Sequence, residues 1–273
     1  MRAAAVALVL ITMLVVLAAK VPATLVIPEN HYLTQKRVEA IQAVRGTVWD
    51  GQMLLAGRQK KNRYLLEWSV QKSCLLMMDF CVDVKIKSFH QTSRPGELNA
   101  SLNVPLAASL FRQTCAPFSS FELEHLNGVL TPQMIQLVVP ELVDSESDLV
   151  LNDVNLIVDL DKGLLESASG QISMDAGAVK FMNNRQLMRQ NLSALSGTID
   201  HVNTAETGYQ LQLRDSRNRN YLGIQTSATG EGFNFIVYDL FARAFGAPPL
   251  RGQSGNPPRF EISQKIGDMI CSQ

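Results

Sequence analysis

Three serines that could supply a nucleophile lie close together in the sequence, at Ser167, Ser169 and Ser173. A serine hydrolase of the α/β type presents its nucleophile on a sharp G-x-S-x-G turn, and this motif does not occur in the sequence. The serines instead alternate with residues such as Ala168 and Ile172, which predicts the solvent-facing side of a β-strand.

Three aspartates, Asp153, Asp159 and Asp161, also follow strand spacing. An acid/base or calcium role is the alternative to a solvated strand face, and the spacing favours the strand face. The sequence has no H-E-x-x-H and no phosphate-binding G-x-x-x-x-G-K-[ST] motif. The four histidines are His31, His90, His125 and His201, and none has an aspartate or glutamate at a spacing typical of a catalytic or metal-binding motif. We therefore predict no enzyme activity, no metal and no cofactor.

The four cysteines, Cys74, Cys81, Cys115 and Cys271, allow three disulfide pairings in an exported protein. On one extended strand Cys74 and Cys81 would lie about 23 Å apart, whereas a disulfide needs Cα atoms within about 7 Å. The chain must therefore turn between them, and a loose helical turn after Trp68 would serve. We favour Cys74–Cys81 with Cys115–Cys271; free buried thiols are the alternative.

The composition is that of a folded domain, with 46% hydrophobic and 18% charged residues among 273. The 25 basic residues equal the 25 acidic ones, so no basic face for nucleic acid is expected. The one short basic run, Arg58 to Arg63, is typical of a solvated turn between strands.

An uncharged apolar run extends from Ala3 to Ala19, between Arg2 and Lys20. As a helix it would span about 25 Å, near the lower limit for crossing a bilayer. A cleaved secretory signal is the alternative, but the residues after the run make a poor cleavage site. We predict a membrane anchor over residues 1–27, and either interpretation exports the remainder of the chain.

Residues 28–45 are predicted to form a linker helix leading away from the membrane. The prediction rests on apolar residues at roughly helical spacing between His31 and Arg45, namely Leu33, Val38, Ile41 and Val44.

From residue 46 the hydrophobic pattern has a period of two and turn residues separate the runs, without long helices between them. This predicts a mainly β, predominantly antiparallel domain over residues 46–246 with a few short helices. The clearest strands alternate from Val82 to Ile86, Leu98 to Val104, Val154 to Leu160 and Tyr209 to Leu213.

Two segments, Leu102 to Phe111 and Phe235 to Phe245, each pass from a strand into a short apolar helix. We treat two similar halves of the domain as a hypothesis. Residues 247–273 begin with a Pro/Gly-rich stretch and are predicted to form a C-terminal arm.

The most specific local signature is Gly46-Thr47-Val48-Trp49-Asp50-Gly51, followed by Trp68 on what should be the next strand. Gly46 can release the chain from the preceding helix, and Gly51 can accommodate a bulge or a close backbone approach. Trp49 and Trp68 could then stack across neighbouring strands. Ordinary core tryptophans beside ordinary turns would explain the same residues.

This arrangement resembles the type II secretion system protein N family. In that family a short N-terminal membrane segment precedes a G-[TS]-[VL]-W-x-G strand opening and a second tryptophan. Only Gly46, Thr47, Trp49, Gly51 and Trp68 carry the resemblance residue by residue, and these are structural positions.

The resemblance implies a single-pass inner-membrane protein of a Gram-negative bacterium with its C-terminal domain in the periplasm. It implies an accessory subunit that supports export of folded proteins through contacts with other secretion subunits. The family's domain is also similar to the β-rich grooves of AsmA-like envelope proteins, so a lipid-binding or lipid-transfer module is the alternative. An apolar sheet face left open to a ligand would favour the lipid-binding function, and an apolar face covered by helices or a partner would favour the role as a secretion subunit.

Overall fold

The computed structural model describes residues 21–25, 38–57, 62–89, 95–105, 119–135, 142–183, 186–202, 207–244, 247–248 and 256–265. Strands dominate these residues, and the helices among them are short: η1 Ala23–Leu25, α2 Lys72–Leu75, α3 Pro132–Ile135 and α4 Asp239–Ala244.

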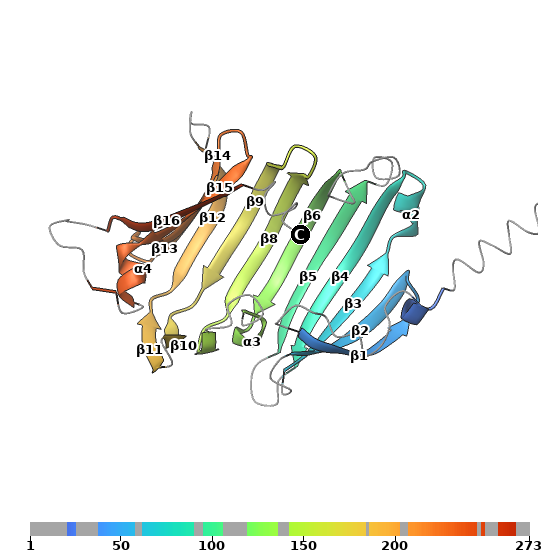
Figure 1. Ribbon diagram of the computed structural model, residues 1–273, viewed down its shortest axis with the longest axis horizontal. Helices are drawn as coiled ribbons and strands as arrows, with labels where there is room; N and C mark the ends of the chain where they lie inside the picture. Colours follow the sequence, from blue (N-terminus) through green and yellow to red (C-terminus); the bar gives the residue numbers. More distant parts are fainter. Residues whose placement is uncertain are drawn as a thin grey trace, which may run out of the picture.

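Thirteen strands form one antiparallel sheet in the order β1-β2-β3-β4-β5-β6-β8-β9-β12-β13-β14-β15-β16 (Figure 1). Three further strands form a small antiparallel sheet in the order β11-β10-β7. The bounds in the large sheet are β1 Val38–Gly46, β2 Asp50–Gly57, β3 Arg63–Val70, β4 Asp79–Phe89, β5 Gly96–Pro105, β6 Ser120–Leu130, β8 Leu149–Asp159, β9 Leu164–Met174, β12 Leu195–His201, β13 Thr207–Asp215, β14 Asn220–Ser227, β15 Gly232–Tyr238 and β16 Pro258–Lys265. Those in the small sheet are β7 Leu142–Ser145, β10 Gly177–Asn183 and β11 Gln186–Leu192. The predicted mainly β, antiparallel class is confirmed, and the four predicted strands correspond to β4, β5, β8 and β13, with Leu160 one residue beyond the end of β8.

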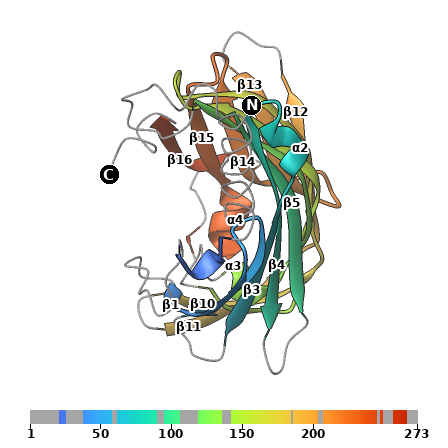
Figure 2. The ribbon, with the colours of Figure 1, turned by 90° about the vertical axis from the view of Figure 1, so that its right-hand side faces the viewer.

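The large sheet is curved, and α3 and α4 lie on its concave side (Figure 2). The face that contacts α3 is identified by two contacts: the Tyr64 hydroxyl donates to the Gln133 carbonyl at 2.8 Å, and Ser88 Oγ lies 3.1 Å from Thr131 Oγ1. Tyr64 is buried, and burial raises the pKa of its phenol although a hydrogen bond with Asn62 opposes the rise.

The apolar side chains follow this concave face from strand to strand because the register keeps them opposite one another. One such row crosses six neighbouring strands: Leu66, Ile86, Leu98, Gly128, Leu151 and Ile172. A second row runs beside it: Val70, Val82, Leu102, Leu123, Leu156 and Ala168.

The predicted linker helix is wrong over residues 38–45, which belong to strand β1. The pairing of β1 with β2 shifts register between Ile41 and Ala43. This irregularity places Ile41 and Val44, three residues apart, in one buried cluster with Ala23 of η1. A bulge therefore produced the three-residue spacing that a helix would also give. The sheet therefore includes residues on the N-terminal side of Gly46.

The predicted C-terminal arm is wrong in part, because residues 258–265 pair along β15 as the last strand of the sheet. Arg259 of this strand donates to the fully buried Asp239 of α4 at 2.8 Å. The predicted passage from strand to helix after Phe235 is confirmed by β15 and α4. In the matching segment Leu102 to Pro105 belongs to β5, and residues 106–111 lie outside the described residues.

Among the residues that the structure describes, no helix has the length and apolar character to span a membrane. The predicted anchor lies outside the described residues except for Val21 to Leu25.

Candidate functional site

The apolar concave face is the first candidate site, since a lipid or a partner would have to contact it. In the middle of the sheet its side chains are only half-buried, including Ile86, Leu98, Leu123 and Leu156. Such side chains would be fully buried if another layer covered them completely. The face is therefore partly open at its centre.

Short elements cover the margins of this face. Ala23 of η1 is fully buried against Ile41 and Val44 of β1, and Met53, Leu55 and Trp68 pack against that cluster. Met134 of α3 is buried, and its sulfur faces Gly96, where an added Cβ would lie only 2.7 Å from it. Among the described elements, these cover the margins, while apolar side chains of the central strands stay partly exposed.

The opposite face of the sheet carries polar side chains that pair across strands. Lys87 Nζ binds Glu67 Oε2 at 2.8 Å, Lys85 forms an ion pair with Glu97, and Asn103 donates to Glu122 at 3.1 Å. The bond from Lys85 holds the pKa of the Glu97 carboxyl below its usual value. We call this side the polar face. Paired groups of both signs make it a water-compatible surface that can also bind a protein.

Two reciprocal β-bulges interrupt the polar face at β6 and β8, the sixth and seventh of the thirteen strands. On β6 the extra residue is His125, and on β8 it is Asp153; both have left-handed backbones, with φ of 51° and 46°. Asn155 Oδ1 accepts from the His125 N–H, and Asn127 Oδ1 accepts from the Asp153 N–H, each at 2.7 Å. We call His125, Asn127, Asp153 and Asn155 the double bulge.

The same asparagines also donate their amide N–H groups to the carbonyls of the two extra residues. Asn127 donates to His125 O at 2.9 Å and Asn155 to Asp153 O at 2.8 Å. The bulges take the N–H and C=O groups of His125 and Asp153 out of the regular strand pairing, and the two asparagine side chains supply hydrogen bonds to these groups instead. Because a bulge bends and twists its strand, two of them at the centre contribute to the curvature of the sheet.

His125 Nδ1 and Asp153 Oδ1 lie 2.7 Å apart, and both side chains are exposed. The hydrogen bond to Asp153 raises the pKa of His125, and the same bond lowers the pKa of Asp153. This pair resembles two parts of a catalytic triad, but within the described residues no serine, threonine or cysteine side chain hydrogen-bonds to His125 or Asp153. Its bonds support a structural role in the double bulge.

The sequence prediction missed this pair, although the hydrophobic pattern contains a signal for it. On β6 the apolar positions step from Leu123 to Leu126, and on β8 they step from Leu151 to Val154. Both steps are three residues instead of two, and the register shifts occur at the same places. Each extra residue restores the phase that keeps the next apolar side chain on the concave face.

The other aspartates and serines singled out in the sequence do not come together with this pair, apart from Ser169. Ser169 Oγ accepts from Asn155 at 3.4 Å. Asp159 ends β8, and its hydrogen bonds to Lys162 keep its pKa below the usual value although burial opposes this. Ser167 and Ser173 lie on β9, and Asp161 lies in the turn between β8 and β9. Within the described residues, no three His, Cys, Asp or Glu side chains lie close enough together to hold a metal ion.

The Gly46-to-Gly51 segment forms the turn between β1 and β2. Gly46 ends β1 with a φ of 91°, where an added Cβ would lie 2.4 Å from the Asp50 carbonyl. It releases the chain from a strand, which corrects the predicted release from a helix. Thr47 Oγ1 accepts from the N–H groups of Trp49 and Asp50 at 3.3 and 3.1 Å and so fixes the turn.

Trp68 joins this turn from β3. Its indole lies on Gly51, where a Cβ would be 2.4 Å from Cζ2, and its Nε1 donates to Val48 O at 3.1 Å. The close approach predicted for Gly51 is therefore present. The stacking of Trp49 on Trp68 stays a prediction.

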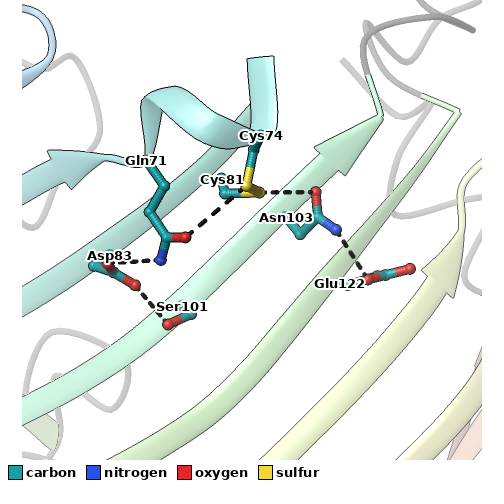
Figure 3. Close-up of a disulfide and its surroundings, with 7 residues drawn as sticks. All are labelled: Gln71, Cys74, Cys81, Asp83, Ser101, Asn103 and Glu122. Carbon is teal, nitrogen blue, oxygen red and sulfur yellow. Dashed lines mark hydrogen bonds between the residues drawn. A yellow bond between two sulfur atoms is a disulfide. The ribbon is translucent and has the colours of Figure 1, made fainter. Parts of the chain in front are cut away.

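The predicted disulfide between Cys74 and Cys81 is present, with Cα atoms 5.9 Å apart (Figure 3). It joins α2 to the start of β4, so the predicted helical turn does bring the two cysteines together. Gln71, just before α2, donates to Asp83 at 2.9 Å on the polar face. Cys115 and Cys271 lie outside the described residues.

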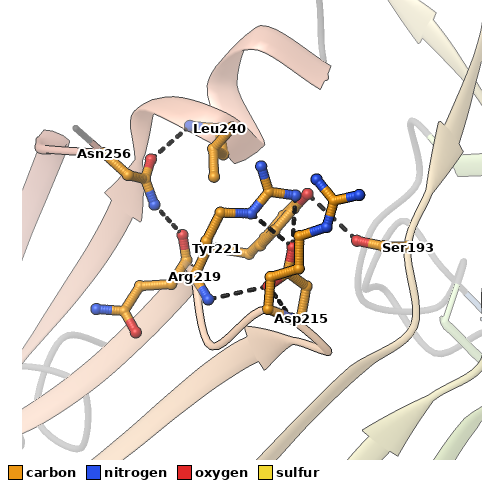
Figure 4. A network of polar contacts seen from close by, with 8 residues as sticks. Ser193, Asp215, Arg219, Tyr221, Leu240 and Asn256 are labelled. Atoms are coloured by element: carbon orange, nitrogen blue, oxygen red, sulfur yellow. Dashed lines mark hydrogen bonds and ion pairs between the residues drawn. The ribbon is translucent and has the colours of Figure 1, made fainter. Parts of the chain in front are cut away.

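A polar network joins the turn after β13 to α4 (Figure 4). Asp215 is buried and accepts from Arg219 Nε at 2.8 Å. Burial opposes ionisation of this carboxyl, but the side-chain and backbone bonds from Arg219 keep its pKa below the usual value. Asn256 binds the carbonyl of Asn220 and accepts from the Leu240 N–H at 2.8 Å. These bonds tie the β13–β14 turn and α4 to the segment before β16.

No protein-family model, no curated protein and no solved structure matches this chain.

Proposed function

We propose that this protein is a membrane-anchored accessory subunit of the type II secretion system, acting in the periplasm through contacts with other secretion subunits. The observation that carries the proposal is the unit formed by Gly46, Thr47, Gly51 and Trp68. These are residues of the family signature: Thr47 fixes the β1–β2 turn, in which Gly46 lies close to Gly51, and Trp68 of β3 packs on Gly51 and donates to Val48 O.

The polar face supplies a surface suited to this role. Its cross-strand ion pairs, such as Lys87 with Glu67, stay hydrated in the free protein and can exchange partners when a subunit binds. Backbone pairing holds the strands in fixed register, so a partner would meet a preorganised surface.

The second candidate function is binding of a lipid chain on the concave face. One observation favours it: apolar side chains on the central strands, such as Leu98 and Leu123, are half-buried instead of covered. A lipid groove needs such an open apolar strip with polar groups kept to its margins.

Photo-crosslinking in cells separates the two functions because neighbouring residues of one strand face opposite sides. Val84 and Lys85 on β4 form one matched pair of probe positions, and Leu213 and Gln212 on β13 form another. Each position receives a photoreactive amino acid, and the adducts are identified by mass spectrometry.

Adducts of Lys85 or Gln212 with secretion subunits are the expected result. Lipid adducts at Val84 and Leu213, with none at their neighbours, would replace the assembly function with the lipid function. If no position yields a secretion subunit in actively secreting cells, the proposal is overturned.

A further inference from the structure

The turn between α2 and β4 exposes three large apolar side chains in succession. Leu76 is 90% exposed, Met77 78% and Met78 48%. Runs of three exposed apolar residues are unfavourable in water, and where they occur they mark a surface that binds something.

This turn is held in shape by its own bonds. The N–H groups of Leu76, Met77 and Met78 donate to the carbonyls three residues earlier, at 3.2, 2.8 and 3.2 Å. The Cys74–Cys81 disulfide then closes the segment at its base. The backbone of Met78 is left-handed, with a φ of 62°, a conformation that usually falls to glycine or asparagine. The apolar residues are thus presented by a fixed turn and not by a collapsed loop.

The turn lies at the same end of the molecule as η1, whose preceding residues Val21 and Pro22 are the first that the structure describes after the apolar N-terminal run. That run ends one residue before Lys20, and Val21 accepts from the N–H of Val48 in the β1–β2 turn at 3.1 Å. The same β1–β2 turn lies beside the end of β3, because Trp49 O accepts from the Val70 N–H at 2.6 Å. In Figure 1, η1 and α2 both lie at the right-hand end of the long axis.

We infer that Leu76, Met77 and Met78 insert into the surface of the bilayer that holds the N-terminal run, as a second membrane contact of the domain. The occupant follows from the position of the turn, which lies at the same end of the sheet as η1, and η1 comes shortly after the apolar run of the proposed anchor in the sequence. Interfacial binding of this kind combines buried apolar side chains with basic residues near anionic headgroups, and Lys72 of α2 supplies an exposed one. Two contacts would fix the orientation of the sheet relative to the bilayer, which a single anchor cannot do.

This inference rests on the membrane anchoring in the proposed function but not on any secretion partner. It is tested with the full chain in its native membranes, with a photoreactive amino acid at Leu76 or Met77. The matched controls are Leu187 on β11 and Ile262 on β16, which are also exposed apolar residues. In Figure 1, β11 and β16 lie at the opposite end of the long axis. Each sample is divided into membrane and soluble fractions before the adducts are analysed.

The expected result is a chain in the membrane fraction that forms phospholipid adducts from probes at Leu76 and Met77 but not from probes at the two control positions. A chain in the membrane fraction without lipid adducts at Leu76 and Met77, or with protein adducts there, overturns the second contact and leaves the anchor intact. Recovery of the chain in the soluble fraction overturns the anchor itself, and the inference with it.

Discussion

The buried carboxylate of Asp239 gives the sharpest prediction, because one substitution removes its charge and keeps its shape. The side chain is 1% exposed and binds two arginines, Arg243 and Arg259. Arg259 is itself only 12% exposed, whereas Arg243 is 43% exposed and can be hydrated. In Asp239→Asn, Arg259 therefore becomes a buried cation without a counter-charge.

Leaving one partner of a buried pair unpaired costs about 3–5 kcal/mol. Arg259 belongs to β16, so this cost should fall on the docking of that strand. Since 1.4 kcal/mol is a factor of ten, amide protection of β16 should fall by about 10² to 3 × 10³-fold. Hydrogen exchange read by mass spectrometry on the full chain measures this directly for the peptide covering residues 258–265.

The matched control is Asp144→Asn on β7, which breaks a more exposed pair with Lys180. Its cost should stay below about 1 kcal/mol, so protection of β7 and β10 should change by less than about tenfold. If Asp239→Asn leaves β16 protection as little changed as this control, the assignment of β16 to the domain through Arg259 is refuted.

Two further predictions concern the double bulge and the signature turn. The pKa of His125, measured by NMR titration, should lie above the ordinary value of 6.5 and return toward 6.5 in Asp153→Asn. The pair should stabilise the sheet between pH 3.8 and pH 6.5. This stabilisation should be lost as the pH rises through the folded-state pKa of His125 or falls through that of Asp153. An unchanged His125 titration in the variant would contradict the hydrogen bond. Gly51→Ala should destabilise the domain by about 1–3 kcal/mol and shift tryptophan emission, because the new Cβ meets the Trp68 indole, whereas Gly223→Ala has ordinary contact distances and should cost less. Equal costs at the two glycines would refute the close approach.

The strands could be predicted from the sequence wherever alternation is regular, as in β4 and β13. The pattern failed where bulges change its period. In β1 the three-residue step from Ile41 to Val44 imitated a helix, because a bulge and a helical turn bring the same spacing to one face.

The double bulge could not be predicted as a site because its parts come from two strands. His125 and Asp153 are 28 residues apart, and only the pairing of β6 with β8 brings them together. The three-residue steps in the apolar pattern indicate each bulge, but register decides which bulges meet. The strand β16 was missed for another reason: Phe260 and Ile262 are too few alternating positions to stand out after a Pro/Gly-rich stretch.

The second membrane contact bears on which function the concave face serves. If the β1 and α2 end lies at the bilayer, as proposed above, the strand order runs outward from β1 to β16. Twelve steps of about 4.8 Å give about 58 Å along the curve of the sheet. A lipid held at one place would be crosslinked only from adjoining strands, for example from Val84 on β4. A path for lipid along the sheet would also be crosslinked from Ile199 on β12, five positions farther out in the strand order. An assembly subunit would give lipid at neither position and protein adducts from the polar face.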